Sequence, residues 1–188
     1  MILYPTETLY AIGVNALDER ELTKLYDLKE RDRNKPPSWL VRNIEDVEKY
    51  AVVSPMAMRI AERFLPGSLT LILKAKTDVP FEVIHVDQTI GFRISPDPVA
   101  QKVIAEYMEK HDAPLTCTSA NVSGLATLST VGEILQQFGP RANMIDTVVD
   151  DGPRKGLAST IVRIVDEKVT VLREGEITEV QIREVIGS

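Results

Sequence analysis

Short apolar runs alternate along the chain with longer segments in which apolar residues recur at helical spacing. The short runs are bounded by Gly, Pro or polar clusters, a pattern that predicts strands. They lie at residues 1–4, 38–41, 68–75, 89–94, 115–119, 144–150, 159–165 and 169–174. The last two flank Asp166-Glu167-Lys168 and predict a hairpin, so we expect a mixed sheet rather than a wholly parallel one.

Five helix starts are marked by residues that can cap a first turn. In each, an Asp, Ser or Thr is followed by Pro or, three residues later, by an acid or amide. These starts are Asp18 with Glu21, Ser54-Pro55, Asp97-Pro98, Thr130 with Glu133, and Thr178 with Gln181. The first helix should run to Lys29. Helices alternating with strands predict an α/β fold, in which a mixed parallel and antiparallel twisted sheet carries flanking helices.

Composition and charge narrow the class of protein. The 188 residues, 44% hydrophobic and 27% charged, fit a single globular domain, 1–188. We find no membrane-spanning stretch and no signal-peptide layout in the sequence, and the one cysteine, Cys117, excludes an internal disulfide and disfavours a Cys-based zinc site. We therefore expect a cytoplasmic protein without membrane partners. The net charge of −6 disfavours tight binding to nucleic acid, because such binding usually depends on an excess of basic over acidic residues.

Several catalytic signatures are missing from the sequence. It has no GxxxxGK[ST], GxGxxG, HExxH or G-x-S-x-G motif, so we expect neither a P-loop nor a covalent hydrolase, and no protein-bound metal. His85 and His111 each stand alone and are interpreted as ordinary surface or loop residues.

Three clusters of small polar residues follow or precede predicted strands. They are "PTET" (5–8), "TSANVSG" (118–124) and "GLAST" (156–160). Hydroxyls and backbone N–H groups in such loops suit phosphate or carboxylate oxygens, and ligands gather at strand ends in open α/β sheets. The alternative stays open for each cluster alone, since the same residues favour turns and caps.

Cationic side chains supply a second candidate feature. Lys29, Arg31, Arg33 and Lys35 alternate through the segment 28–35, which could clamp a polyphosphate or could be a solvated helix end. Arg93 and Arg173 each end a predicted strand, where they could bind an anion or form exposed ion pairs of little energetic value.

The clusters together resemble the YrdC/TsaC family, the L-threonylcarbamoyladenylate synthases. Six motifs of that family appear in order between Tyr4 and about Ile177. They are "YPTETLYAIGVNALDE", "KER", "LPGSLTLIL", "GFRISPDP", "TSANVSG" and the pair "DDGPRKGLASTIVRI" and "VTVLREGEI". One such motif is a weak signal, whereas six in sequence order are a strong one.

The resemblance implies a YrdC-like fold with a broad concave cavity, and a nucleotidyltransferase. Such an enzyme joins L-threonine, bicarbonate and ATP into threonylcarbamoyl-AMP and releases pyrophosphate, with Mg²⁺ as the expected metal. A downstream threonylcarbamoyl-transferase complex then modifies tRNA beside the anticodon, so the enzyme itself need hold tRNA only weakly.

Site residues follow from the same resemblance, motif by motif. It implies that Lys29 and Arg31 act on the ATP phosphates and the carboxylates. The residues implied for threonine are Thr6, Tyr10, Arg93 and Ser159. Those implied for the nucleotide are Arg31, Lys35, Ser119, Asn121, Thr127 and Arg173. At Cys117 the backbone is expected to matter and the thiol is not.

The sequence departs from the family pattern at several positions. "KPPSWL" (35–40) replaces the usual K/N-P-L run, Ser68 replaces a proline, Ser95 is inserted before Pro96, and Ala11 stands where the family has glycine. The family usually has a strand and a helix before its first motif, so we expect either a start farther upstream or a sheet that lacks one edge.

Three alternatives remain open. The first is an adenylating module that handles carbamoyl phosphate, which normally lies within a larger chain carrying zinc-finger cysteines. The second is a YrdC-like module that binds double-stranded RNA or tRNA without synthase activity. The third is a paralogue that keeps the fold and has altered chemistry.

Overall fold

The computed structural model describes residues 1–80 and 83–187. In chain order the elements are β1 (Ile2–Pro5), β2 (Tyr10–Gly13), α1 (Glu19–Lys29), β3 (Ser38–Leu40), α2 (Ile44–Tyr50), α3 (Pro55–Phe64), β4 (Leu69–Lys74), β5 (Thr89–Arg93), α4 (Pro98–His111), β6 (Leu115–Ser119), α5 (Val131–Phe138), the 3-10 helix η2 (Gly139–Met144), β7 (Thr147–Val148), β8 (Thr160–Val165), β9 (Lys168–Arg173) and α6 (Glu179–Ile186). No helix within the described residues is both long and apolar enough to cross a membrane.

The strands of the described residues form one nine-stranded sheet in the order β7-β1-β2-β6-β3-β5-β4-β8-β9. Three neighbouring pairs are parallel, β1 with β7, β3 with β5 and β4 with β8, and the remaining pairs are antiparallel. The predicted mixed α/β fold is therefore confirmed. The strand that opens the chain, β1, pairs on both sides and does not form an edge.

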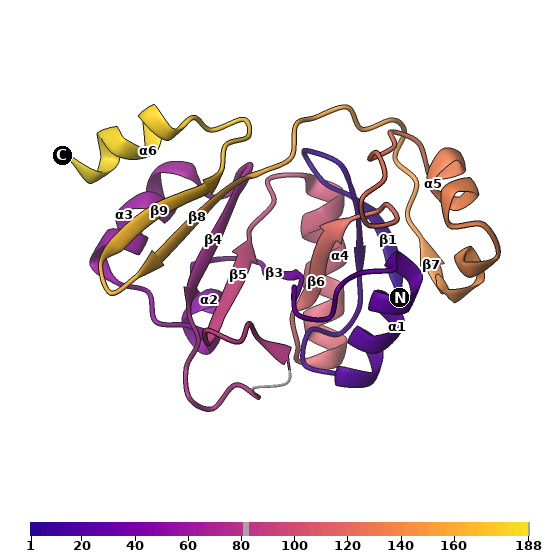
Figure 1. Ribbon diagram of the computed structural model, residues 1–188, viewed down its shortest axis with the longest axis horizontal. Coiled ribbons are helices and arrows are strands. Elements are labelled where there is room, and N and C mark those ends of the chain that lie inside the picture. The colour runs from indigo at the N-terminus through magenta and orange to yellow at the C-terminus, as the bar shows by residue number, and fades with distance from the viewer. Residues whose placement is uncertain (81–82, 188) are drawn as a thin grey trace.

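Two apolar clusters hold the helices against the sheet. On one face α4 packs Ala100, Ile104 and Met108 against Tyr4 of β1 and Leu115 of β6. The larger core lies with α1, α2, α3 and α5, and it continues to α6 through Ile182. Figure 1 shows α3 and α6 beside the β8–β9 hairpin at one end of the molecule, and α1 and α5 at the other end.

The predicted helix caps are confirmed. The side chains of Asp18, Ser54 and Asp97 each accept hydrogen bonds from the first-turn backbone, and Thr130 and Thr178 each form a complete capping box. The hairpin turn is also confirmed, with Asp166 and Glu167 at positive φ. Local side-chain chemistry therefore fixes these boundaries.

Three segments differ from the sequence prediction. The strand expected over 144–150 is only the exposed pair of β7, and residues 139–144 form η2 instead. We did not predict β2, whose four residues are all buried, because a strand covered on both faces shows no polar alternation. The short helix α2 was also missed. The Asn43 side chain caps it by accepting a hydrogen bond from the Asp46 N–H, and Val47 is its one fully buried apolar residue.

Candidate functional site

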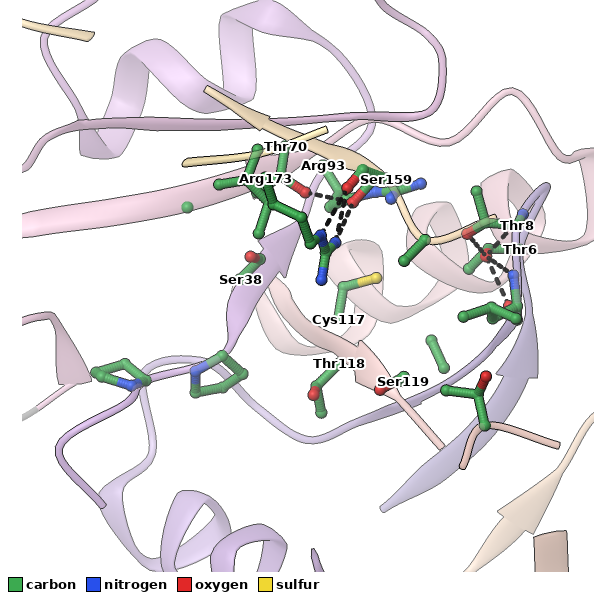
Figure 2. A pocket seen from close by; sticks show the side chains of 18 of the residues that line it. Thr6, Thr8, Ser38, Thr70, Arg93, Cys117, Thr118, Ser119, Ser159 and Arg173 are labelled. Atoms are coloured by element: carbon green, nitrogen blue, oxygen red, sulfur yellow. Dashed lines mark hydrogen bonds between the residues drawn. The ribbon is translucent and has the colours of Figure 1, made fainter. Parts of the chain in front are cut away.

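A cavity of about 340 Å³ opens on one face of the sheet, and its walls come from segments far apart in sequence (Figure 2). All three predicted polar clusters contribute to it, through Thr6 and Thr8, through Thr118 and Ser119, and through Ala158 and Ser159. The β1–β2 loop and the strap before β8 are joined directly, since the Gly156 N–H donates to the Thr8 carbonyl at 2.9 Å. The structure thus brings together loops that the sequence shows only as separate turns.

Strand alternation provides the floor of the cavity. Residues two apart on a strand share a face. Such pairs line the cavity on β4, β5 and β6 and at the start of β8: Thr70 and Ile72, Gly91 and Arg93, Cys117 and Ser119, and Ser159, directly before β8, with Ile161. A Cβ on Gly91 would lie 2.8 Å from the Ser38 Oγ, so glycine keeps that part of the floor open. The site is therefore built on the sheet face and not only at the carboxyl ends of strands, where we expected it.

One end of the cavity, the Arg93 end, consists of Thr6, Thr70, Arg93, Ser159 and Arg173. The hydroxyls of Thr70 and Ser159 are 2.8 Å apart, and Arg173 donates to the Ser159 carbonyl through Nη2 at 2.7 Å and Nε at 3.1 Å. Figure 2 shows Arg93, Arg173, Ser159 and Thr70 gathered together. These groups are held in place before any ligand binds.

Arg93 is fixed by a carboxylate outside the lining. Its Nη2 donates to the Glu7 carboxylate, which also accepts from the Ser95 hydroxyl. The inserted Ser95 is fully buried and so helps to orient this pair. Arg93 is 5% exposed, and its buried Nε has no hydrogen-bond partner among the described residues. A buried donor without a partner is costly, and Arg93 is one of the residues that line the cavity.

The two arginines at this end repel each other electrostatically. Burial first, and the charge of Arg93 second, lower the pKa of Arg173. A ligand that carries negative charge would oppose both effects, because Arg173, unlike Arg93 with Glu7, has no carboxylate partner among the described residues.

The other end, the Arg31 end, is defined by Arg31 with Thr118 and His85, and Ser119 and Thr127 complete the polar lining of the cavity. Helix α1 ends at Glu30 in the left-handed conformation, which turns the following residues away from the helix axis. Arg31 then donates through Nε to the Lys35 carbonyl at 2.6 Å and approaches the Thr118 hydroxyl at 3.4 Å. Burial lowers the pKa of Arg31, so this guanidinium is also a partly desolvated cation facing the cavity.

Lys29 lies behind this end and is not among the residues that line the cavity. It is 1% exposed, and its Nζ donates to the backbone carbonyls of Ser119 and Asn121, the latter at 2.8 Å. Burial first, then the charge of Arg31, lower the pKa of Lys29 to about 7. Asn121 is likewise turned inward, with its amide bonded to Ser119, Val122 and Leu125. Lys29 and Asn121 therefore shape the loop that carries Ser119.

The remaining predicted residues divide between the cavity and the surface. Tyr10 lines the cavity, and its hydroxyl donates toward Asp150 or the Gly152 carbonyl. The Thr6 hydroxyl closes its own turn on the Leu9 carbonyl at 2.6 Å. Lys35 lies outside the lining with a largely exposed side chain, 4.0 Å from the Asp32 carboxylate.

Several lining residues were not predicted from the sequence. They are Ser38, Thr70, His85 and the side chain of Cys117, whereas Thr8 and Thr118 lie within two of the predicted polar clusters but were not assigned a contact of their own. Figure 2 shows the Cys117 sulfur between the two ends, and burial raises the pKa of this thiol. The signal available in the sequence was the two-residue spacing of Thr70 with Ile72 and of Cys117 with Ser119 on predicted strands.

The charged side chains of the cavity lining are positive. Among the described residues that form it, Arg31, Arg93 and Arg173 are cationic and none is Asp or Glu. In the described part of the chain, no group of three or more His, Cys, Asp or Glu could hold a metal ion. The arrangement suits a ligand with two or more anionic groups rather than a cation.

Comparisons with known proteins point in one direction. The model of the Sua5/YciO/YrdC family, described as "Telomere recombination", matches residues 1–175. A Methanocaldococcus jannaschii protein, provisionally named threonylcarbamoyl-AMP synthase, is 40% identical over 94% of this chain and 80% of its own length. The Pyrococcus abyssi threonylcarbamoyl-AMP synthase is 30% identical over the whole chain and 54% of its own length.

A solved structure agrees with these relatives. The crystal structure of P. abyssi Sua5 complexed with L-threonine superposes with a TM-score of 0.86 at 29% identity, and the match covers 99% of this chain and 53% of that one. The present chain thus spans about half the length of the P. abyssi protein.

Proposed function

Because the chain belongs to the Sua5/YciO/YrdC family, we propose that it is a threonylcarbamoyl-AMP synthase. Its substrates would be L-threonine, bicarbonate and ATP, and its products threonylcarbamoyl-AMP and pyrophosphate. The observation that carries the proposal is the 340 Å³ cavity in which three arginines and a row of hydroxyls converge without a carboxylate in the described lining. A volume of this size falls within the range of small-molecule sites.

The Arg93 end fits the amino acid. A threonine carboxylate can pair with the buried Arg93, whose Nε has no partner among the residues that the structure describes, and the Ser159 and Thr70 hydroxyls can bond the substrate's polar groups. Tyr10 provides a flat, buried wall. Carboxylates and guanidinium groups form strong charge-assisted hydrogen bonds, so threonine has its best partners here.

The Arg31 end fits the nucleotide. Arg31 presents a desolvated guanidinium beside Thr118, and Ser119 and Thr127 add hydroxyls to the same region. Arg173 lies on β9 at the Arg93 end and could reach a phosphate from there. For Lys29 the geometry favours a positioning role, because its Nζ bonds the carbonyls of Ser119 and Asn121; Lys35, outside the cavity, could reach the nucleotide only at its rim.

The reaction proceeds through two bond-forming steps. The threonine amine attacks the carbon of bicarbonate and water leaves, which gives a carbamate. A carbamate oxygen then attacks the α-phosphorus of ATP, and pyrophosphate departs with the electrons of the broken P–O bond. Negative charge builds on phosphoryl oxygens, where fixed arginines stabilise it, and holding the reactants together supplies much of the remaining rate.

Mg²⁺ would come with the nucleotide. The described lining offers no carboxylate ligand, whereas Mg²⁺ is commonly held by substrate phosphates. No step in this proposal assigns a metal ligand to the protein.

The product places the enzyme before a transfer step. Threonylcarbamoyl-AMP is an activated acyl adenylate, so a separate threonylcarbamoyl-transferase complex would pass the group to tRNA next to the anticodon. The net charge of −6 fits an enzyme that holds tRNA weakly or not at all. We place this reaction in the cytoplasm, in keeping with the single cysteine of the sequence.

Pyrophosphate release tests the proposal. The protein is mixed with ATP, L-threonine and bicarbonate, and both pyrophosphate and threonylcarbamoyl-AMP are measured. We expect release that requires threonine and bicarbonate together. Release without threonine, or none from folded protein, would overturn the proposal, and salt-sensitive binding of double-stranded RNA in that case would favour the binding module.

A further inference from the structure

His85 lines the cavity although sequence analysis assigned it to a surface or loop position. It begins a tight turn before β5, in which the Gln88 N–H donates to the His85 carbonyl at 2.8 Å and the His85 N–H donates to the Thr89 carbonyl at 3.1 Å. Asp87 ties the turn to the sheet through the Thr89 hydroxyl at 2.6 Å and Arg163 of β8 at 3.0 Å. These bonds hold in place the backbone that carries the imidazole.

The ring of His85 has hydrogen-bonding capacity to spare. It is half-buried, and neither ring nitrogen bonds any residue that the structure describes. A half-buried imidazole on a cavity wall can donate one hydrogen bond when neutral and two when protonated. A ligand in the cavity is the natural partner for these nitrogens.

The charges that face His85 come from two segments. Arg31, on the segment after α1, acts on it electrostatically, as does Asp87 on its own turn, whose carboxylate is bonded to Arg163. Farther along the same cavity are Arg93 and Arg173. Burial is the largest effect on His85 and lowers its pKa, Asp87 opposes this, and Arg31 lowers the pKa further, so these surroundings favour the neutral imidazole.

We propose that His85 is a further nucleotide-contacting residue, which binds the same anionic phosphate group as Arg31. This inference rests on the proposed function for the identity of the nucleotide. A phosphate beside Arg31 cancels the charge that disfavours the imidazolium and accepts a hydrogen bond from it. ATP binding near neutral pH should therefore take up a proton at His85.

Calorimetry of ATP binding tests this inference without turnover. The wild type, His85→Asn and His111→Asn are each titrated with ATP at pH 7 in two buffers of different ionisation enthalpy, with no threonine present. His111 is the matched control, since it is the only other histidine in the sequence and lies at the end of α4 against Tyr107. The γ-phosphate of ATP also titrates near this pH, but equally with all three proteins.

We expect His85→Asn to bind ATP about 10-fold more weakly and to take up measurably less proton than the wild type or His111→Asn. In steady-state assays its KM for ATP should rise while its KM for threonine stays within about twofold. His85→Lys, which carries a fixed charge, should restore affinity and take up no more proton on binding than His85→Asn. Thermal unfolding of each variant shows whether it is folded.

Equal affinity and equal proton uptake in the wild type and folded His85→Asn would overturn the inference. So would the absence of ATP binding by the wild type. If ATP binds with His85-dependent proton uptake but no threonine-dependent pyrophosphate appears, the proposed function fails and the His85 contact stands.

Discussion

The two ends of the cavity are built differently. At the Arg93 end the charged groups stand on strands and are already bonded, Arg93 to Glu7 and Arg173 to the Ser159 carbonyl. At the Arg31 end they stand on connecting segments. Arg31, after α1, bonds the backbone carbonyl of Lys35 and no carboxylate among the described residues, and the imidazole of His85, on a turn, has no bond among them. A rigid end suits selection of a small amino acid, whereas a looser end can follow a phosphate chain through a reaction.

The largest expected effect comes from removing the cation of the Arg31 end. We expect Arg31→Ala to lower kcat/KM for ATP by about 1,000-fold, because a transition-state contact of this kind supplies roughly 3–4 kcal/mol. Pyrophosphate release under limiting ATP measures it. Arg33→Ala is the control, since Arg33 is exposed and pairs with Asp27 at 3.2 Å outside the cavity. Equal losses in both variants would mean that the cavity position of Arg31 does not matter.

Lys29 should be nearly as sensitive, and for a different reason. Lys29→Met leaves the Ser119 and Asn121 carbonyls without their buried donor, so we expect about 2–4 kcal/mol lower stability and about 100-fold lower activity. Urea unfolding and pyrophosphate release report the two effects. Lost activity at unchanged stability would contradict the positioning role and favour direct catalysis.

The same variant predicts a pH signature. The pKa of Lys29, about 7 in the folded protein, lies below the ~10.4 of an unfolded lysine. Between these values the unfolded chain binds more protons, so the contribution of Lys29 to the free energy of unfolding rises with pH from about 7 to 10 and is flat below 7. The stability difference between wild type and Lys29→Met should therefore be larger at pH 9 than at pH 7.

Glu7 tests the rigidity of the Arg93 end. Glu7→Gln keeps the size of the side chain but removes the charge that fixes Arg93, so we expect KM for threonine to rise about 10-fold and KM for ATP to change less than twofold. Glu176→Gln is the matched control, because Glu176 accepts from the Ser68 hydroxyl at 2.5 Å outside the cavity. A rise in both KM values after Glu7→Gln would show that the two ends do not act separately.

The smallest effect is expected at Lys35. Its amine is exposed and 4.0 Å from Asp32, and only its backbone carbonyl contacts Arg31. We expect Lys35→Ala to change KM for ATP by less than about twofold, since exposed charges contribute little. A tenfold rise would extend the nucleotide site beyond the cavity to this side chain.

Much of the fold could be predicted because local chemistry marks its boundaries. Asp18, Ser54 and Thr130 each mark a helix start through a cap that involves only the next three residues, and the structure confirms each cap. By contrast, β2 is buried on both faces and α2 has one buried apolar residue, Val47, so neither shows the periodicity that single-sequence reasoning needs.

The same distinction applies to the residues of the site, some of which local sequence could reveal and others not. Polar loops such as those that carry Thr6 and Ser119 are visible because small hydroxyl residues cluster in each, and the structure does bring these two residues to one cavity. Thr70 and His85 were not visible, because a lone polar residue on a strand or turn gains its meaning only from what the sheet places opposite it. Lys29 shows the converse, since a basic motif suggests contact with phosphate and the structure directs its amine to backbone carbonyls.

The parallel pairing of β4 with β8, in which Leu69 lies opposite Thr160, has a consequence for synthesis of the protein. A ribosome that has not yet translated β8 and β9 has already released the segments with Arg31 and Arg93, but neither Ser159 nor Arg173. Such long-range closure comes late in folding. A nascent chain should therefore acquire its substrate-binding capacity in one late step, and messages truncated before β8 should yield products that cannot sequester ATP or threonine.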